Sequence, residues 1–197
     1  MKIEQIKDKF IKGIPAHILD GEYFYYETGP SANKDLMIVW GGFEKCAPDY
    51  LVSRRSYPYY IVKYTISGKG TYIKGTQKFI LSQDYISGFG PKDEHLYSCD
   101  SHDPLMHIFI AFTGSKAKTL FEQSSLDKRG AFKASNPADS LYLIKSLFKT
   151  GMTKPPYSQQ ICCAYLQAFL LNQNPLADDT QQTTSFNTYL RCKQYID

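Results

Sequence analysis

The segment YYIVKYTISGKG (59–70) alternates as a β-strand does and then runs into a tight turn. Apolar side chains occupy every second position of the strand: Tyr60, Val62, Tyr64 and Ile66. Successive side chains of a strand point to opposite faces, so these four share one face of a sheet. Gly68-Lys69-Gly70 has the residue types of a hairpin turn, and TYIKG (71–75) reads as the next strand. The segment therefore predicts β-structure.

Further short strands separated by turn residues extend on both sides of this segment. We expect them at EYFYYET (22–28), LMIVWGGFEKC (36–46), YLVSRR (50–55), QKFIL (77–81) and LMHIFIAFTG (105–114), with a brief extended run within SQDYISGFGP (82–91). The 16 Tyr and 12 Phe residues agree with this, because aromatic side chains favour pleated, half-buried surfaces. Many short strands at close spacing predict a sandwich or barrel and not alternating strand–helix units.

After Gly114 the pattern becomes helical. KAKTLFEQS (116–124) predicts a short helix, and Asn136-Pro137 predicts the cap and first residue of a longer one. The apolar positions of the longer helix follow helical spacing: Leu141, Ile144, Leu147 and Phe148. We expect Gly151 to end it and Ser158 to cap a further helix that reaches Asn172. The fold class is thus mainly β with C-terminal helices, a barrel followed by a helical pair with an outer apolar stripe.

The end of the chain suggests a linker and one more helix. NPLADDTQQTTS (174–185) is polar, and SFNTYLRCKQYID (185–197) begins a helix that reaches the last residue. We expect this helix to continue in a longer parent chain. The predicted organisation is an N-terminal arm (1–21), a barrel (22–115), a helical dimerisation segment (116–174), and a linker with the start of a further domain (175–197).

Composition argues against several classes of protein. The net charge of +4 is spread evenly along the chain, and no basic tract predicts direct contact with nucleic acid. The five cysteines form no CxxC pair, which is typical of a reducing compartment. No apolar run approaches the roughly 20 residues of a membrane helix. We therefore expect a cytoplasmic protein without a membrane partner.

An ordered set of residues resembles the N-terminal sensor domain of AraC-type transcription regulators. The set comprises GFEKC (42–46), PDY (48–50), Arg54, YYIVKYTISGKG (59–70), Gly75, Leu81, Asp84, Pro91, His95, Tyr97 and HIFIAFTG (107–114). The resemblance covers residues 36–115 and implies a cupin-like barrel, that is, a double-stranded β-helix or jelly roll. YLRCKQYID (189–197) is similar to the first helix of the family's DNA-binding half. That half carries two helix-turn-helix units, which are missing here.

The resemblance implies that the barrel binds a small hydroxylated effector, a sugar first of all, and controls DNA binding through a homodimer. It implies that the ligand-binding residues are Arg54, Tyr97, His107 and Phe109, with Glu44 and Trp40 near the pocket mouth. The residues alone leave plainer roles open. His107 could be a hydrogen-bonded core histidine, Arg54 could form a surface ion pair as Arg55 could, and Tyr97 could be a surface-strand tyrosine.

Two positions depart from the family pattern. Ser82-Gln83 stands before Asp84 where the family has Pro-Gly, so the geometry of that turn is open. Phe109 stands where an arabinose-responsive member has tryptophan, which leaves the identity of the ligand open.

The sequence favours neither a metal nor catalysis. The first cupin metal motif, His-x-His with a glutamate, has no counterpart between Gly68 and Asp84. His95 and His107 with Glu44 or Glu94 are the ligands that remain, so we expect no metal and no cofactor. Nucleophile-elbow, phosphate-loop and dinucleotide motifs are missing too. The rival functions are a metal-free enzyme such as a sugar epimerase or isomerase, and a dimerisation module that binds nothing.

Overall fold

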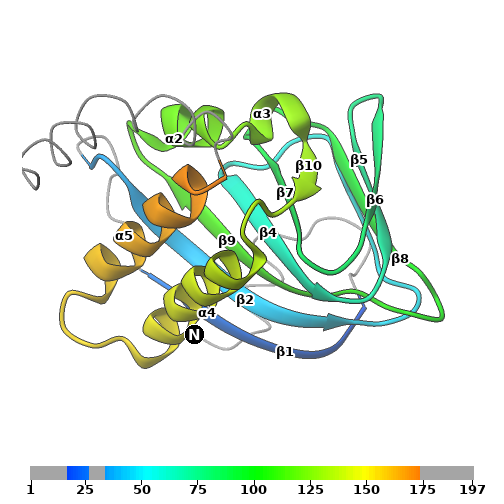
Figure 1. Cartoon of the computed structure of the whole chain (residues 1–197), viewed down its shortest axis with the longest axis horizontal. Coiled ribbons are helices and arrows are strands. Elements are labelled where there is room, and N and C mark those ends of the chain that lie inside the picture. Colours follow the sequence, from blue (N-terminus) through cyan, green and yellow to red (C-terminus); the bar gives the residue numbers. More distant parts are fainter. Residues whose placement is uncertain (1–16, 27–33, 174–197) are drawn as a thin grey trace, which may run out of the picture.

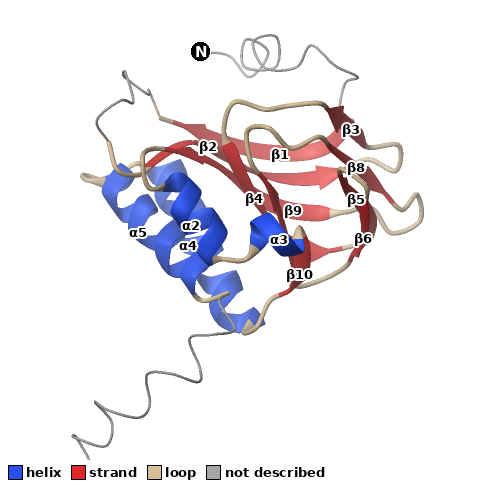
Figure 2. Cartoon of the chain, turned by 90° about the horizontal axis from the view of Figure 1, so that it is seen from above, coloured by secondary structure: helices blue, strands red, loops and turns tan. Residues whose placement is uncertain are grey.

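The computed structural model describes residues 17–26 and 34–173, which form two facing antiparallel sheets and a group of helices (Figures 1 and 2). One sheet has the strand order β1 (Ile18–Tyr25), β2 (Met37–Cys46), β9 (Met106–Thr113), β4 (Tyr60–Ser67), β7 (Tyr85–Phe89), β10 (Ala131–Lys133). The other has the order β3 (Leu51–Arg54), β8 (His95–Cys99), β5 (Gly70–Lys74), β6 (Gln77–Leu81). The chain crosses between the sheets after β2, β3, β4, β6, β7 and β8, which is the winding of a jelly roll. The predicted cupin-like fold class is confirmed.

The helices are α2 (Ala117–Gln123), α3 (Leu126–Arg129), α4 (Pro137–Thr153) and α5 (Ser158–Leu171). Figure 2 shows α4 and α5 on the outer face of the six-stranded sheet. Their buried side chains Ile144, Leu147, Leu166 and Phe169 join those of the sheet in one core. Of the helices in the described ranges, none combines the length and the apolar character that a membrane crossing requires.

Strand β4 is buried on both faces. Val62 and Tyr64 belong to the core under the helices, as the alternation of the segment predicts. Ile61 faces the opposite way and belongs to a second core between the two sheets, together with Tyr72 and Tyr97. A central strand covered on both sides can carry apolar residues in both phases. In β4 the phase that faces the other sheet holds Ile61 but also Lys63 and Thr65, so the alternation of the segment remains visible.

Several predicted boundaries and turns are wrong. Strand β1 starts at Ile18, within the predicted arm, because residues 18–21 continue the ladder with β2. The turn at Gly68 does not close a hairpin, since β4 and β5 lie in different sheets. Gly68, with a φ of 82°, packs against the backbone of Pro104 as the chain crosses. Strands β8 and β10 were not predicted. Residues 1–16, 27–28 and 174–197 of the predicted arm, first strand, linker and last helix lie outside the described residues.

The turn before β7 forms without the family's Pro-Gly. Asp84 adopts a φ of 67°, and its backbone N–H donates to Thr65 O at 2.9 Å. The hydroxyl of Tyr64 donates to Asp84 Oδ1 at 2.7 Å. Aspartate tolerates this left-handed conformation better than most residues do. These hydrogen bonds fix the turn that Ser82-Gln83 left open.

The start of α4 is as predicted, and its end is not. The Asn136 side chain accepts a hydrogen bond from the Asp139 N–H at 3.3 Å, and Pro137 is the first helical residue. Gly151 does not end the helix, which continues to Thr153. Ser158 is the first residue of α5 and not its cap, which is Tyr157 with a φ of 61°. The glycine serves packing instead, since a Cβ on Gly151 would lie 2.5 Å from the ring of Phe24.

The packing at Gly151 leads to a test. Alanine has the higher helix propensity, yet Gly151→Ala is expected to lower the free energy of unfolding by about 1–3 kcal/mol, because the methyl group overlaps Phe24. Chemical denaturation measures the change, and Lys149→Ala on the same helix is the control. Phe24→Leu should make the alanine less costly. If Gly151→Ala stabilised the protein, the close packing of α4 on β1 would be disproved.

Candidate functional site

A hollow opens between the two sheets and receives side chains from both. It has a volume of about 70 Å³, small beside the roughly 300–1,000 Å³ of drug-sized ligand pockets. Its lining consists of Trp40, Glu44, Tyr50, Val52, Arg54, Tyr57, Ile61, Lys63, Phe89, His95, Tyr97 and Phe109. This combination of aromatic walls and a few charged groups suits a small polar ligand.

Five of the six predicted ligand residues line this hollow, and the sixth lies directly behind it. The five are Trp40, Glu44, Arg54, Tyr97 and Phe109. Tyr97 is buried and donates to Ser87 Oγ at 3.1 Å, so the alternative of a surface-strand tyrosine is wrong. Arg54 makes no ion pair with any residue in the described ranges, so its alternative is not seen either. His107 is buried behind Glu44 and Lys63, a placement that fits the plainer role of a core histidine.

Pairing of the strands brings these residues together. Glu44 on β2 lies opposite His107 on β9, and Phe109, two residues on, lies opposite Lys63 on β4. Arg54 on β3 lies opposite His95 on β8 in the facing sheet. Two rows of inward side chains, one from each sheet, therefore meet across the hollow. Residues in register on neighbouring strands have Cβ atoms only about 5 Å apart, which explains the close contacts.

An aromatic corner forms one wall. The rings of Trp40 and Phe109 meet edge to face with centroids 4.6 Å apart, and the indole N–H of Trp40 donates to the Tyr57 hydroxyl at 3.0 Å. Gly42 makes room, because a Cβ there would lie 2.5 Å from the Tyr23 ring and 2.8 Å from Phe109. The phenylalanine that departs from the family pattern thus packs against a tryptophan of the neighbouring strand.

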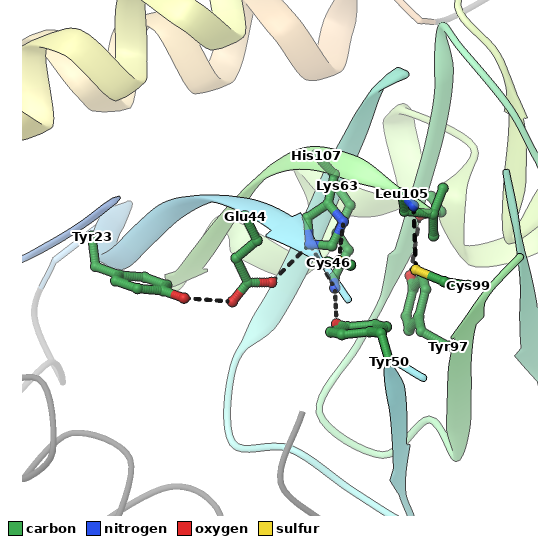
Figure 3. Close-up of polar contacts among 10 residues, drawn as sticks. Tyr23, Glu44, Cys46, Tyr50, Lys63, Tyr97, Cys99, Leu105 and His107 are labelled. Atoms are coloured by element: carbon green, nitrogen blue, oxygen red, sulfur yellow. Dashed lines mark hydrogen bonds and ion pairs between the residues drawn. The ribbon is translucent and has the colours of Figure 1, made fainter. Parts of the chain in front are cut away.

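A chain of polar contacts forms the floor (Figure 3). The Tyr23 hydroxyl donates to Glu44 Oε1 at 3.1 Å, and Glu44 Oε2 lies 2.9 Å from His107 Nε2. The Nζ atom of Lys63 lies 3.3 Å from the same His107 Nε2 and 3.4 Å from the Tyr50 hydroxyl. Both oxygens of the Glu44 carboxylate are therefore engaged inside the protein.

One histidine nitrogen cannot donate to Glu44 and accept from Lys63 at once. The shorter contact, to a carboxylate, is the stronger hydrogen bond, so we assign the proton of the neutral ring to Nε2. The other nitrogen, Nδ1, is then the acceptor and lies 3.8 Å from Cys46 Sγ. In this assignment Lys63 does not donate to His107. Its ammonium donates to the Tyr50 hydroxyl and lies over the face of the Tyr97 ring, with Nζ 4.3 Å from the ring centroid.

Burial and neighbouring charges set the ionisation of this group. Burial, followed by the charge of Lys63, lowers the pKa of His107, so the ring is neutral near pH 7. Burial alone would raise the pKa of Glu44, but the hydrogen bond from His107 and the nearby Lys63 outweigh it and lower that pKa. Burial also lowers the pKa of Lys63, and the charge of Glu44 opposes this effect. The carboxylate and the ammonium are thus a partly buried pair bridged by a neutral imidazole.

His95, which the sequence offered only as a candidate metal ligand, also lines the hollow. Its ring stacks on Phe89 with centroids 3.6 Å apart, and its Nδ1 donates to the Asp93 carbonyl oxygen at 2.9 Å. Its Nε2 is buried and has no partner in the described residues. Because Nδ1 carries the proton, Nε2 is a bare acceptor. A ligand hydroxyl is the kind of group that would satisfy it.

Three further polar residues of the lining were not predicted as ligand residues from the sequence: Tyr50, Tyr57 and Lys63. A signal for Lys63 was present, because it falls between Ile61 and Thr65 in the phase opposite to the apolar face of β4. In a half-buried strand this phase would face solvent, and a lysine there would not indicate a site. Only the knowledge that helices cover the apolar face of β4 shows that Lys63 points into the hollow.

Comparison with known proteins identifies the family. The family model described as the AraC-like ligand binding domain matches residues 41–159. The chain belongs to this family. A curated relative, the Msm operon regulatory protein of Streptococcus mutans, is 28% identical over 163 residues, which make up 80% of this chain. Those residues are 58% of the relative, so the AraC-like chain spans little more than half of that protein.

Solved structures with similar arrangements of strands include two that we name. A cupin 2 conserved barrel domain protein from Leptotrichia buccalis is 13% identical, with a TM-score of 0.37 over 50% of this chain and 43% of that one. The protein YhaK from Escherichia coli is 12% identical, with a TM-score of 0.41 over 49% and 46%. The jelly-roll assignment of the AraC-like chain rests on its own strand order and not on these values.

One group in the described part of this AraC-like chain has the residue types of a metal site: Glu44, Cys46 and His107. Its geometry does not suit a metal, because Glu44 meets Nε2 of the imidazole while Cys46 meets Nδ1 on the other side. The Nζ atom of Lys63 already lies 3.3 Å from Nε2, where its positive charge would repel a metal ion. Glu94, the other carboxylate considered, is exposed and does not line the hollow.

His95 makes the stability of the AraC-like domain depend on pH. Burial lowers its pKa from 6.5 to about 4, against the hydrogen bond to Asp93. Between pH 6.5 and pH 4 this histidine is protonated in the unfolded chain but remains neutral in the folded protein. The free energy of unfolding therefore has its full value above pH 6.5 and falls as the pH is lowered toward 4. We expect this residue to account for about 2–3 kcal/mol of the loss.

Denaturation curves at several pH values measure the effect. His95→Phe keeps the stack on Phe89, and the fall in its free energy of unfolding between pH 6.5 and 4 should be shallower than in the unaltered protein. His102→Phe, at an exposed loop position, should leave the slope unchanged. An equal slope for His95→Phe and the unaltered protein would show that His95 does not resist protonation.

Proposed function

We propose that this chain is the effector-sensing and dimerisation part of an AraC-type transcription regulator. The hollow binds a small hydroxylated ligand, a sugar or a close relative of one, and the ligand state controls DNA binding by a domain outside the described residues. The regulator acts in the cytoplasm and performs no catalysis. The name of the Streptococcus mutans relative, an operon regulatory protein, supports this role.

The observation that carries the proposal is the convergence of Arg54, Tyr97, Phe109, Trp40 and Glu44 on one hollow. Phe109 and Trp40 offer apolar surface to a ring, while Arg54 offers its donors. His107 positions the carboxylate of Glu44 by their hydrogen bond. Sugars and hydroxy acids have both apolar faces and polar groups, and the hollow offers a partner to each.

The fold offers a route from ligand to partner. Strand β4 lines the hollow with Ile61 and Lys63 and contacts the helices with Val62 and Tyr64. Exposed apolar side chains on and beside α4 and α5 provide a surface for a second copy: Tyr142, Met152, Tyr157, Ile161 and Leu171. If β4 can adopt two placements relative to the helices, a ligand that binds one of these conformations more tightly increases the population of that conformation. The proposed readout is the geometry of a homodimer.

Thermal unfolding with a panel of sugars and organic acids tests the proposal. Saturable stabilisation by at least one compound, recovered unchanged afterwards, is the result expected of a sensor. Conversion of the compound would favour the rival metal-free epimerase or isomerase. No stabilisation by any compound up to millimolar concentration would favour the dimerisation module without a ligand and contradict the sensor.

A further inference from the structure

The hollow contains a guanidinium whose donors meet no acceptor among residues 17–26 and 34–173. Arg54 lies with Cζ 5.0 Å from the centroid of the Tyr57 ring, which covers one face of the group. The N–H donors of a guanidinium point outward in its own plane, so the ring does not satisfy them. No described residue forms an ion pair with Arg54. The neighbouring Arg55 is exposed and does not line the hollow.

The second cation, Lys63, is also left with spare donors. Since His107 donates its Nε2 proton to Glu44, the described part of the chain offers the ammonium one hydrogen-bond acceptor, the Tyr50 hydroxyl at 3.4 Å. The face of Tyr97 adds electrostatic attraction but takes no conventional hydrogen bond. An ammonium has three donors, and leaving them unused away from water is costly.

The charges of the lining do not balance. Arg54 is positive, Glu44 is negative, and His95 is neutral near pH 7. Burial lowers the pKa of Lys63, and the charge of Glu44 opposes this effect and favours the ammonium form, which is the second positive charge. Two positive charges and one negative charge leave one positive charge without a partner. Among the described residues Glu44 forms an ion pair with neither Arg54 nor Lys63, and its contact of this kind is with His107. A ligand with one negative charge would complete the balance.

We propose that the ligand is a small hydroxylated acid, whose carboxylate or phosphate oxygens accept from Arg54 and Lys63 and one of whose hydroxyls donates to His95 Nε2. The fork of Arg54 matches two oxygens of such a group. The bare acceptor on His95 accounts for the hydroxyl. The inference rests on the proposed function and narrows its ligand class.

Isothermal titration calorimetry of the unaltered chain tests this with matched probes. The neutral parents are glucose and galactose, and the charged forms are their uronic acids and 6-phosphates. The charged form of at least one sugar should bind at least about tenfold more tightly than its parent, because hydrogen bonds to charged groups are the stronger ones. The uronic-acid and phosphate arms distinguish the two kinds of anion.

Variants assign the preference to the two cations. Arg54→Gln should remove most of the tenfold preference, and Arg54→Lys should keep part of it because the charge remains. Lys63→Met should reduce it as well, and Arg55→Gln should leave it unchanged. Melting curves establish that each variant is folded before titration.

The results separate this inference from the proposed function. If a neutral sugar binds as tightly as its acid and its phosphate, the charged ligand class is wrong while the sensor proposal stands. If Arg55→Gln abolishes the preference and Arg54→Gln keeps it, the site is wrong. If no probe binds at millimolar concentration but the wider panel yields a neutral ligand, the inference again fails alone. Failure of every compound in the panel contradicts both.

Discussion

Glu44→Ala is expected to lower the free energy of unfolding by about 3–5 kcal/mol. The substitution leaves Lys63 partly buried without its counter-charge, and it removes the acceptor of both Tyr23 and His107. Breaking a buried pair by removing one partner costs more than the pair contributes, because the remaining charge is uncompensated. Denaturation with urea at pH 7 gives the value.

Two controls isolate the charge. Glu22→Ala, on the exposed face of the neighbouring strand, should change stability by less than about 0.5 kcal/mol. Lys63→Met in the Glu44→Ala background removes both charges and should recover much of the loss. If Glu44→Ala were as mild as Glu22→Ala, the polar floor of the hollow would not be a coupled group.

Phe169→Ala is expected to cost a similar amount, about 3–5 kcal/mol, for a different reason. Its ring is fully buried between α5 and the six-stranded sheet and meets the Tyr64 ring at 6.4 Å. Truncation leaves a cavity in the core that joins the helices to β4. Leu171→Ala, two residues along the same helix and 43% exposed, is the matched control and should cost well under half as much. Equal losses for the two variants would mean that α5 does not pack as described.

The fold was largely predictable because its strands carry local signals. The alternation of β4 and the run of β9 are visible in the sequence, as are the Asn136-Pro137 start of α4 and the change to helix after Gly114. Features that depend on distant partners were not predictable. HLYSC (95–99) becomes β8 by pairing with β3 and β5, and Gly151 stays helical because its missing side chain admits Phe24.

The candidate site was predictable only in part. The family resemblance led to Arg54, Tyr97 and Phe109, which the hollow brings together. Lys63 was missed because a lysine on a strand usually marks a solvent face, and only the helices on the other face show that this phase points inward. The sequence offers His95 only as a candidate metal ligand, and its role in the lining depends on the tautomer that the carbonyl oxygen of Asp93 selects. Neither fact has a local signature.

Fluorescence of Trp40 tests the central claim, that the hollow is the effector site, most directly. The chain has a single tryptophan, it lines the hollow, and its ring meets that of Phe109. Titration with a compound that stabilises the protein should produce a saturable change in its emission. Arg54→Gln should shift the midpoint to higher concentration, and Arg55→Gln should not. A compound that stabilises the protein but leaves the emission of Trp40 unchanged binds elsewhere, and that result would contradict the account.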